Sequence, residues 1–118
     1  MLSSAHRLTD GASFHLAVRS GRRAGCRTLV VHLAGDGAGA GDVPPRIGFV
    51  VSKAVGNAVV RNRVKRRLRH LAREHVSTLP GSAVLVVRAL PAAAGASYAE
   101  LGADLARCLA RVSAAVGR

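Results

Sequence analysis

The sequence is short of acidic and of aromatic residues, and each shortage excludes something. Six Asp and Glu stand against 18 Lys and Arg, so the formal net charge of the 118 residues is +12. A surface of this sign needs an acidic partner, and a phosphate polyanion is the commonest one, because each neutralised phosphate releases condensed counterions. With no Trp, one Tyr and two Phe, the chain cannot build a large aromatic platform for stacking unpaired bases. Folded RNA, bound through its shape and phosphates, fits both shortages better than a sequence-specific single strand.

Cysteine is scarce, and long apolar runs are absent. Cys26 and Cys108 have no second Cys or His at metal-ligand spacing, which argues against a zinc site, and we expect both thiols to be buried or inert. No apolar run approaches the roughly 20 residues of a membrane span, the first residues lack the apolar core of a signal peptide, and neither terminus carries a lipidation motif. These features predict a cytoplasmic protein with reduced thiols and no membrane partner.

The sequence also lacks the residue groups of an independent enzyme. Its carboxylates are scattered singly, no Ser, His and Asp stand in a catalytic order, and the five His form no metal spacing. His70 and His75, for example, would lie on different faces of a helix. We therefore expect no catalytic residue, no metal site and no small-molecule substrate, and any chemistry would belong to a partner.

What the sequence does contain is enough apolar side chain for one core. With 49% hydrophobic residues, residues 1–118 are expected to form a single domain. Apolar periodicity and Gly or Pro stops predict helices over 9–20, 57–75 and 98–116 and strands over 27–34, 46–52 and 82–88, with room for a further short strand near 22–26. The continuous apolar run of 82–88 indicates a central strand that is covered on both faces.

These elements predict an α+β fold. We expect a single-domain sandwich of a small mixed sheet with three helices in the order α-β-β-α-β-α, in which a βαβ crossover carries the helix over 57–75. Strands 27–34 and 46–52 are consecutive, so an antiparallel hairpin between them is plausible, although the Gly-rich connector over 35–45 is longer than favoured hairpin loops.

The helix over 57–75 carries a concentrated positive charge. An advance of about 100° per residue places Val60, Val64, Leu68 and Leu71 on one narrow stripe, with cations on the opposite and flanking sides. A charge run usually marks a solvated helix face, but such a face mixes signs, and this one has no carboxylate before Glu74. We therefore favour polyanion binding over a merely solvated face. The cations are Arg61, Arg63, Lys65, Arg66, Arg67, Arg69 and Arg73.

Two segments of the sequence carry a resemblance to a known family. The first, over 46–53, reads RIGFVVSK, and the second, over 56–69, reads GNAVVRNRVKRRLR. Together they closely resemble the signature of bacterial ribonuclease P proteins. Arg7-Leu8, followed by Phe14 and Gly21, resembles the N-terminal helix of that family. The resemblance covers most of the chain and is weaker in the Gly-rich connector and after Ala89.

The resemblance implies a function for the chain and a separate role for an RNA partner. The chain would be the protein subunit of ribonuclease P, which assists a catalytic RNA subunit in the endonucleolytic removal of the 5′ leader from precursor tRNA. It would bind the leader and the RNA subunit, broaden the substrate range and raise substrate affinity. Hydrolysis would belong to the RNA, so the holoenzyme needs Mg²⁺, while the chain alone would bind no cofactor and be inactive.

The resemblance also assigns site residues. The RNA subunit would be bound by Lys53, Asn57, Arg61, Asn62, Arg63, Lys65, Arg66, Arg67 and Arg69. The leader would lie in a cleft between the first helix and the sheet, against Phe14, Val18 and His32. Many members carry further aromatics on that wall where this sequence has Val18 and His32, and the basic pair after Ser52 is replaced by Lys53-Ala54. We therefore expect the leader bases to stack more weakly on this wall and the leader to be bound more through electrostatic contacts.

Two other classes of protein share these features in part. A ribosomal protein or another structural RNA binder would have the same charge, size and α+β plan. The Arg61-Asn62-Arg63 block with its upstream strand is what distinguishes the ribonuclease P family from that class. A DNA-binding protein is the second alternative, but no helix-turn-helix spacing precedes the basic helix and no dimer seam is visible.

Overall fold

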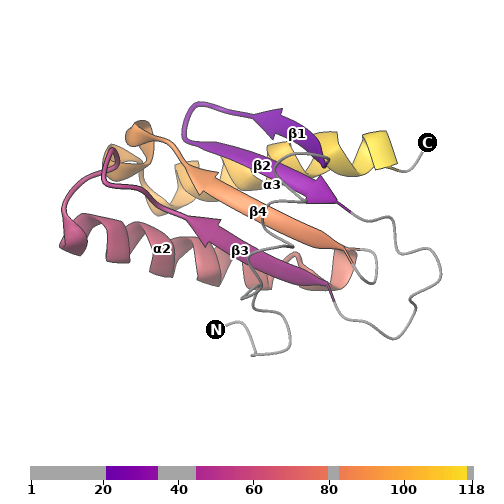
Figure 1. Ribbon diagram of the computed structural model, residues 1–118, viewed down its shortest axis with the longest axis horizontal. Helices are drawn as coiled ribbons and strands as arrows, with labels where there is room; N and C mark the ends of the chain where they lie inside the picture. Colours follow the sequence, from indigo (N-terminus) through magenta and orange to yellow (C-terminus); the bar gives the residue numbers. More distant parts are fainter. Residues whose placement is uncertain (1–20, 35–44, 80–82, 117–118) are drawn as a thin grey trace.

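A four-stranded mixed sheet forms the frame of the molecule. In a computed structural model that describes residues 21–34, 45–79 and 83–116, the strands pair in the order β1-β2-β4-β3 (Figure 1). They are β1 (Arg22–Gly25), β2 (Leu29–Ala34), β3 (Arg46–Val50) and β4 (Val84–Ala89). β2 is antiparallel to both β1 and β4, whereas β3 and β4 are parallel. The predicted mixed sheet is therefore present, and β4 takes an inner position.

The predicted hairpin between 27–34 and 46–52 is wrong, because β4 lies between β2 and β3. The side chains of Leu85, Val86 and Val87 in β4 are fully buried. The most apolar strand is therefore placed between two neighbours, where both of its backbone edges are paired, instead of at an edge of the sheet. β3 and β4 are parallel, and parallel neighbours need a long crossover instead of a tight turn. The segment that contains the basic helix provides this crossover.

The short strand near 22–26 is a full member of the sheet. β1 runs along the edge of β2, and the turn between them is closed by a hydrogen bond of 2.8 Å from Cys26 N to Leu29 O. Only Ala24 among its four residues is buried, so the sequence of this strand shows little apolar pattern. The described part of the chain has the order β-β-β-α-β-α, with two α-helices where the prediction has three. The helix predicted over 9–20, with Phe14 and Val18, lies outside the described residues.

Both α-helices pack on one face of the sheet. α2 (Ala58–Arg73) runs along the β3 side, and α3 (Tyr98–Val116) lies beneath β1 and β2 (Figure 1). The main core lies between helices and sheet, where Leu68, Leu105 and Leu85 are fully buried. A Cβ on Gly102 of α3 would stand 3.1 Å from Leu71 Cδ2 of α2, so the absence of a side chain lets the two helices approach closely.

The opposite face of the sheet is also buried in part. Ala34, Val84 and Val86 alternate with the core residues along their strands, so they point away from both helices, and Val86 is fully buried. The prediction that the strand over 82–88 buries both of its faces is confirmed by these side chains. Two short 3₁₀ helices that were not predicted, η2 (Val76–Thr78) and η3 (Pro91–Gly95), flank β4 in sequence. Among the described ranges, no helix has both the length and the apolar character to cross a membrane.

Candidate nucleic-acid interface

The basic helix α2 begins at a turn that holds its first residues in place. Val55 N donates a hydrogen bond to Ser52 O at 3.1 Å, and the side chain of Val55 is buried. Asn57 is the N-cap, and its Oδ1 accepts a hydrogen bond from Val60 N at 3.0 Å. Asn57, a predicted RNA contact, therefore also stabilises the start of the helix. Lys53, the other predicted contact before α2, is exposed in the turn.

An apolar stripe determines which face of α2 the cations occupy. Val64, Leu68, Leu71 and Ala72 are buried, and Val60 packs against the same core. The predicted stripe is confirmed, with Ala72 as an additional member. No carboxylate lies within the helix, and its last turn adds two basic residues. Because the stripe is anchored between sheet and α3, the basic side chains remain on the outer and flanking sides.

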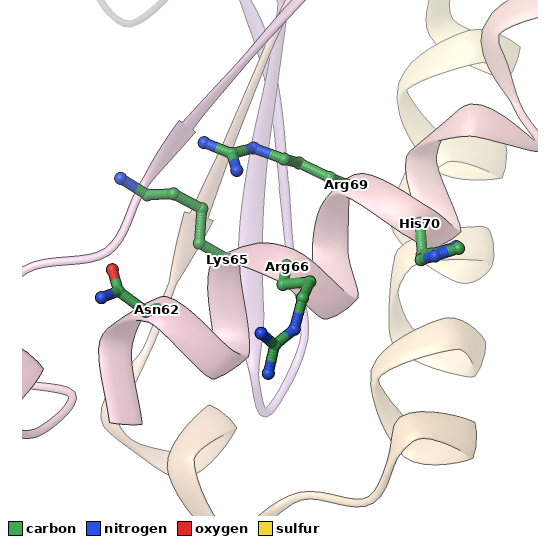
Figure 2. A pocket seen from close by; sticks show the side chains of 5 residues that line it. All are labelled: Asn62, Lys65, Arg66, Arg69 and His70. Atoms are coloured by element: carbon green, nitrogen blue, oxygen red, sulfur yellow. The ribbon is translucent and has the colours of Figure 1, made fainter. Parts of the chain in front are cut away.

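One pocket gathers four of the predicted residues. Asn62, Lys65, Arg66 and Arg69 line a cavity of about 360 Å³ together with His70 (Figure 2). Residues three and four apart are neighbours on a helix surface, so this spacing brings successive turns of α2 together. Figure 2 shows the side chains of Lys65 and Arg69 extending to the same side of the helix. His70 lies outside the predicted set, although its position four residues after Arg66 was a signal in the sequence.

The pocket concentrates positive charge without a compensating acid. Lys65, Arg66 and Arg69 lie within one another's field, and no carboxylate is among the described lining residues. Like charges at this spacing destabilise a helix slightly, and a bound anion relieves that repulsion. A guanidinium group can bind a phosphate through two parallel hydrogen bonds, while the Lys65 ammonium acts as a point charge and the Asn62 amide as a donor. The arrangement can bind neighbouring phosphates of one RNA backbone.

Three predicted arginines lie outside this pocket on the flanks of α2. Arg61 and Arg63 are half-buried, and the Nε atom of each is buried without a hydrogen-bond partner. Arg67 is also half-buried, and its Nη1 donates to Ala96 O at 3.3 Å, in the segment that leads into α3. The structure therefore divides the predicted set into pocket residues, flanking arginines, a helix cap and an exposed lysine.

His32, the remaining predicted residue, lies in a second pocket on the opposite face of the sheet. It is 6% exposed and lines a cavity of about 340 Å³ with Arg23, Val30, Arg88 and Leu90. The strand register explains this group, because Arg23 pairs with His32 and Val30 pairs with Arg88 on the same face. Arg23 and Arg88 were missed at the sequence level, since only the register reveals that they flank His32.

The second pocket favours a neutral imidazole. Burial lowers the pKa of His32 below its usual value, and the positive charges of Arg23 and Arg88 lower it further. Its Nδ1 atom is buried and has no hydrogen-bond partner. His32 lines this pocket next to two guanidinium groups, so its imidazole can hydrogen-bond to a nucleotide that enters the pocket.

Neither pocket suits a metal ion. In the part of the chain that the structure describes, no group of three or more His, Cys, Asp and Glu could hold one. The polar groups of the two pockets are cations, an amide and imidazoles, whereas Mg²⁺ prefers carboxylate and other oxygen ligands.

Comparison with known proteins identifies the family. The family model for ribonuclease P matches residues 2–113. The chain is 72% identical over 116 residues to the ribonuclease P protein component of Nocardioides sp., a match that covers 98% of each chain. It is 50% identical over 133 residues to that of Salinispora tropica, covering 100% of this chain and 98% of the relative. Its fold is similar to that of the RNase P protein of Staphylococcus aureus, with a TM-score of 0.77, 27% identity and coverage of 91% and 96%. The chain thus belongs to the ribonuclease P protein family, the protein subunits of an endoribonuclease that matures the 5′ ends of tRNA.

Proposed function

We propose that this chain serves ribonuclease P by binding RNA on two separate surfaces. The basic face of α2 binds the catalytic RNA subunit, and the sheet face that carries His32 binds the 5′ leader of precursor tRNA. The pocket of about 360 Å³ on α2 carries this proposal, because its described lining includes Lys65, Arg66 and Arg69 and no carboxylate. A phosphate backbone supplies the negative charge that this surface lacks.

The nine predicted residues contribute to this interface in different ways. Asn62, Lys65, Arg66 and Arg69 contact phosphates inside the pocket. Lys53, Arg61 and Arg63 extend the contact along its borders, where their charged side chains bind RNA phosphates. Asn57 and Arg67 act mainly by orienting α2, through the N-cap and the hydrogen bond to Ala96, and add to the polar surface.

The leader surface combines few stacking groups with positive charge. Arg23 and Arg88 bind leader phosphates, and His32 hydrogen-bonds to a base edge or a 2′-hydroxyl in the same pocket. Phe14 and Val18 remain the predicted apolar wall. Such a surface recognises the backbone more than the bases, so leaders of different sequence would be accepted.

The chemistry belongs to the RNA subunit in this proposal. Mg²⁺ supplies charge stabilisation for phosphodiester hydrolysis in the holoenzyme, and RNA oxygens would hold it, since the described residues offer no suitable ligand group. The protein contributes by binding the precursor and the RNA subunit together, which raises substrate affinity. We place this activity in the cytoplasm, where precursor tRNA is made.

Cleavage of a precursor tRNA by a bacterial ribonuclease P RNA at near-physiological Mg²⁺ tests the proposal. The wild-type chain should restore cutting at the mature 5′ end, and the chain alone should cut nothing. The double variant Arg66→Ala, Arg69→Ala should need roughly 100-fold more protein for half-maximal cleavage, because each lost charge-assisted contact costs about tenfold.

The matched control removes two arginines from the other helix. Arg107 and Arg111 are exposed on α3, so the double variant Arg107→Ala, Arg111→Ala loses the same net charge away from α2. It also loses the Arg107–Asp104 ion pair and the hydrogen bond from Arg111 to Gly25 O, so urea denaturation must first show that it is folded under the assay conditions. The concentration of this control variant that gives half-maximal cleavage should differ from that of wild type by less than threefold. Equal losses in the two double variants would show that overall charge, and not the face of α2, governs assembly.

A further inference from the structure

Cys26 and Cys108 meet in the fold although 82 positions separate them in the sequence. Cys26 lies in the turn between β1 and β2, and Cys108 lies in α3. Their Sγ atoms are 2.9 Å apart, and both thiols are free. We propose that the two cysteines form a reversible intramolecular disulfide when they meet a small-molecule disulfide. This inference does not depend on the RNA-binding role proposed above.

The surroundings hold the two sulfur atoms near each other. Thr28 Oγ1 donates to Asp104 Oδ2 at 2.6 Å, and Arg111 Nη1 donates to Gly25 O at 3.0 Å. These hydrogen bonds tie the β1–β2 turn to α3 on both sides of Cys26. A disulfide has a sulfur–sulfur length of about 2.0 Å, so small side-chain rotations suffice to close the remaining gap.

The two thiols differ in their access to solvent. Cys26 is half-buried, whereas Cys108 is fully buried. Burial, together with the neighbouring Cys26, raises the pKa of the Cys108 thiol to about 12, so Cys108 stays protonated at neutral pH. An external disulfide therefore meets Cys26 first, and Cys108 acts as the resolving thiol. Of the two cysteines expected to be buried or inert, Cys108 is buried and Cys26 is half-buried.

The reaction is two successive thiol–disulfide exchanges. The Cys26 thiolate attacks one sulfur of a disulfide RSSR, which forms a bond from Cys26 to SR and releases RS⁻. Cys108 gives its proton to this RS⁻ and attacks the Cys26 sulfur, which breaks the mixed disulfide and releases a second RS⁻. That second thiolate takes up the proton that Cys26 lost. The two cysteines lose two electrons and two protons, and RSSR becomes two RSH.

The bond would join the β1–β2 turn to α3 and leave α2 untouched. Reduced thiols are the resting state in a reducing cytoplasm, so the disulfide would mark exposure to oxidant. Closing a loop of about 80 residues restricts the unfolded chain, and oxidation should raise Tm by roughly 10 °C. Affinity for the RNA subunit should change less than twofold, because neither cysteine lies on the basic face.

Incubation of the reduced full-length chain with glutathione disulfide tests the proposal. The chain should lose the mass of two hydrogen atoms, lose both reactive thiols when assayed unfolded, and yield a Cys26–Cys108 linked peptide. Dithiothreitol should reverse all three changes and the rise in Tm. A glutathione adduct that persists on the wild-type chain, or a disulfide-linked dimer, would overturn the proposal.

Two matched variants separate the roles of the thiols. Cys108→Ala should accumulate a glutathione adduct on Cys26, because the resolving thiol is gone. Cys26→Ala should remain unmodified, since Cys108 is buried. Equal modification of both variants would contradict the assigned order of attack. If either variant fails to fold, the mass and Tm of the oxidised wild-type chain alone decide the question.

Discussion

Arg67 and Ala96 join the basic helix to the segment that leads into α3. The Nη1 atom of Arg67 donates a hydrogen bond to Ala96 O at 3.3 Å, and Ala96 itself is buried. An arginine from the predicted RNA-binding set therefore also supports the fold. Its neighbour Arg66 is exposed and lines the pocket on the outer side of α2. Adjacent arginines in one basic run thus have different tasks.

We expect Arg67→Ala and Arg66→Ala to affect different properties. Loss of the Arg67 hydrogen bond should lower the free energy of unfolding by about 1 kcal/mol, as measured by urea denaturation. Arg66→Ala should change it by less than about 0.5 kcal/mol but weaken binding of the RNA subunit about tenfold. Equal stability of the two variants would contradict a structural role for Arg67.

Variants of the N-cap residue of α2 can also distinguish an effect on folding from an effect on RNA binding. Asn57→Ala removes the acceptor of the Val60 N–H and should destabilise the chain by about 1 kcal/mol. Asn57→Asp keeps the N-cap acceptor, and its negative charge interacts favourably with the positive end of the helix dipole. This variant should therefore retain wild-type stability. It also places a negative charge beside the RNA surface and should weaken RNA binding. Urea midpoints and RNA titrations of both variants check this, and unimpaired binding by Asn57→Asp would place the RNA away from this end of α2.

The buried contact between Thr28 and Asp104 should make the free energy of unfolding depend on pH in acidic solution. The hydrogen bond from Thr28 Oγ1 is the main reason why the pKa of Asp104 lies below its usual value. The unfolded chain therefore binds this proton more readily. The stabilisation is present above the unfolded pKa of about 3.9 and is lost as the pH falls through the lower folded value.

Thr28→Val removes the hydroxyl donor while nearly preserving the side-chain volume. It should cost about 2 kcal/mol at pH 7, because the lost bond is to a charged group. The difference between wild type and variant should shrink at pH values below the folded pKa of Asp104, where the carboxyl is protonated in both states. Urea denaturation across this range measures it, and a difference that does not change with pH would contradict the account.

His32 should make stability fall in mildly acidic solution. Its pKa is lowered in the folded chain by burial and by Arg23 and Arg88. The unfolded chain, with an imidazole pKa near 6.5, therefore binds the proton first, and stability is lost as the pH falls below about 6.5. His32→Leu removes this group from its buried position. Urea midpoints at pH 7.5 and 5.5 should fall less for the variant than for wild type, and parallel falls would show that another group is responsible.

The sequence predicts local structure well where one chemical pattern dominates. The apolar stripe of α2, with Val64 and Leu68 buried, follows directly from helical periodicity. The strand over 82–88 is inner because its side chains are apolar on both faces. The four pocket residues are also predictable from their spacing, since they follow one another along a helix whose buried side is known.

Relationships between distant segments are not visible in such patterns. Periodicity predicts strands over 27–34 and 46–52, but it does not show which strands pair with each other. The pairing depends on the position in the sheet where β4 is stabilised most. The Arg23 and Arg88 neighbours of His32 depend on register between strands. The contact of Cys26 with Cys108 depends on how the β1–β2 turn meets α3. The leader-binding roles of Phe14 and Val18 stay predictions.

The salt dependence of binding to a bacterial ribonuclease P RNA tests the central claim most directly. The logarithm of the binding constant should fall linearly with the logarithm of salt concentration for wild type, and Arg66→Ala, Arg69→Ala should bind about 100-fold more weakly. Its slope should be smaller by about two, because two phosphate contacts no longer release counterions. Unchanged affinity and slope in this variant would contradict the assignment of the basic face of α2 as the surface that binds the RNA subunit.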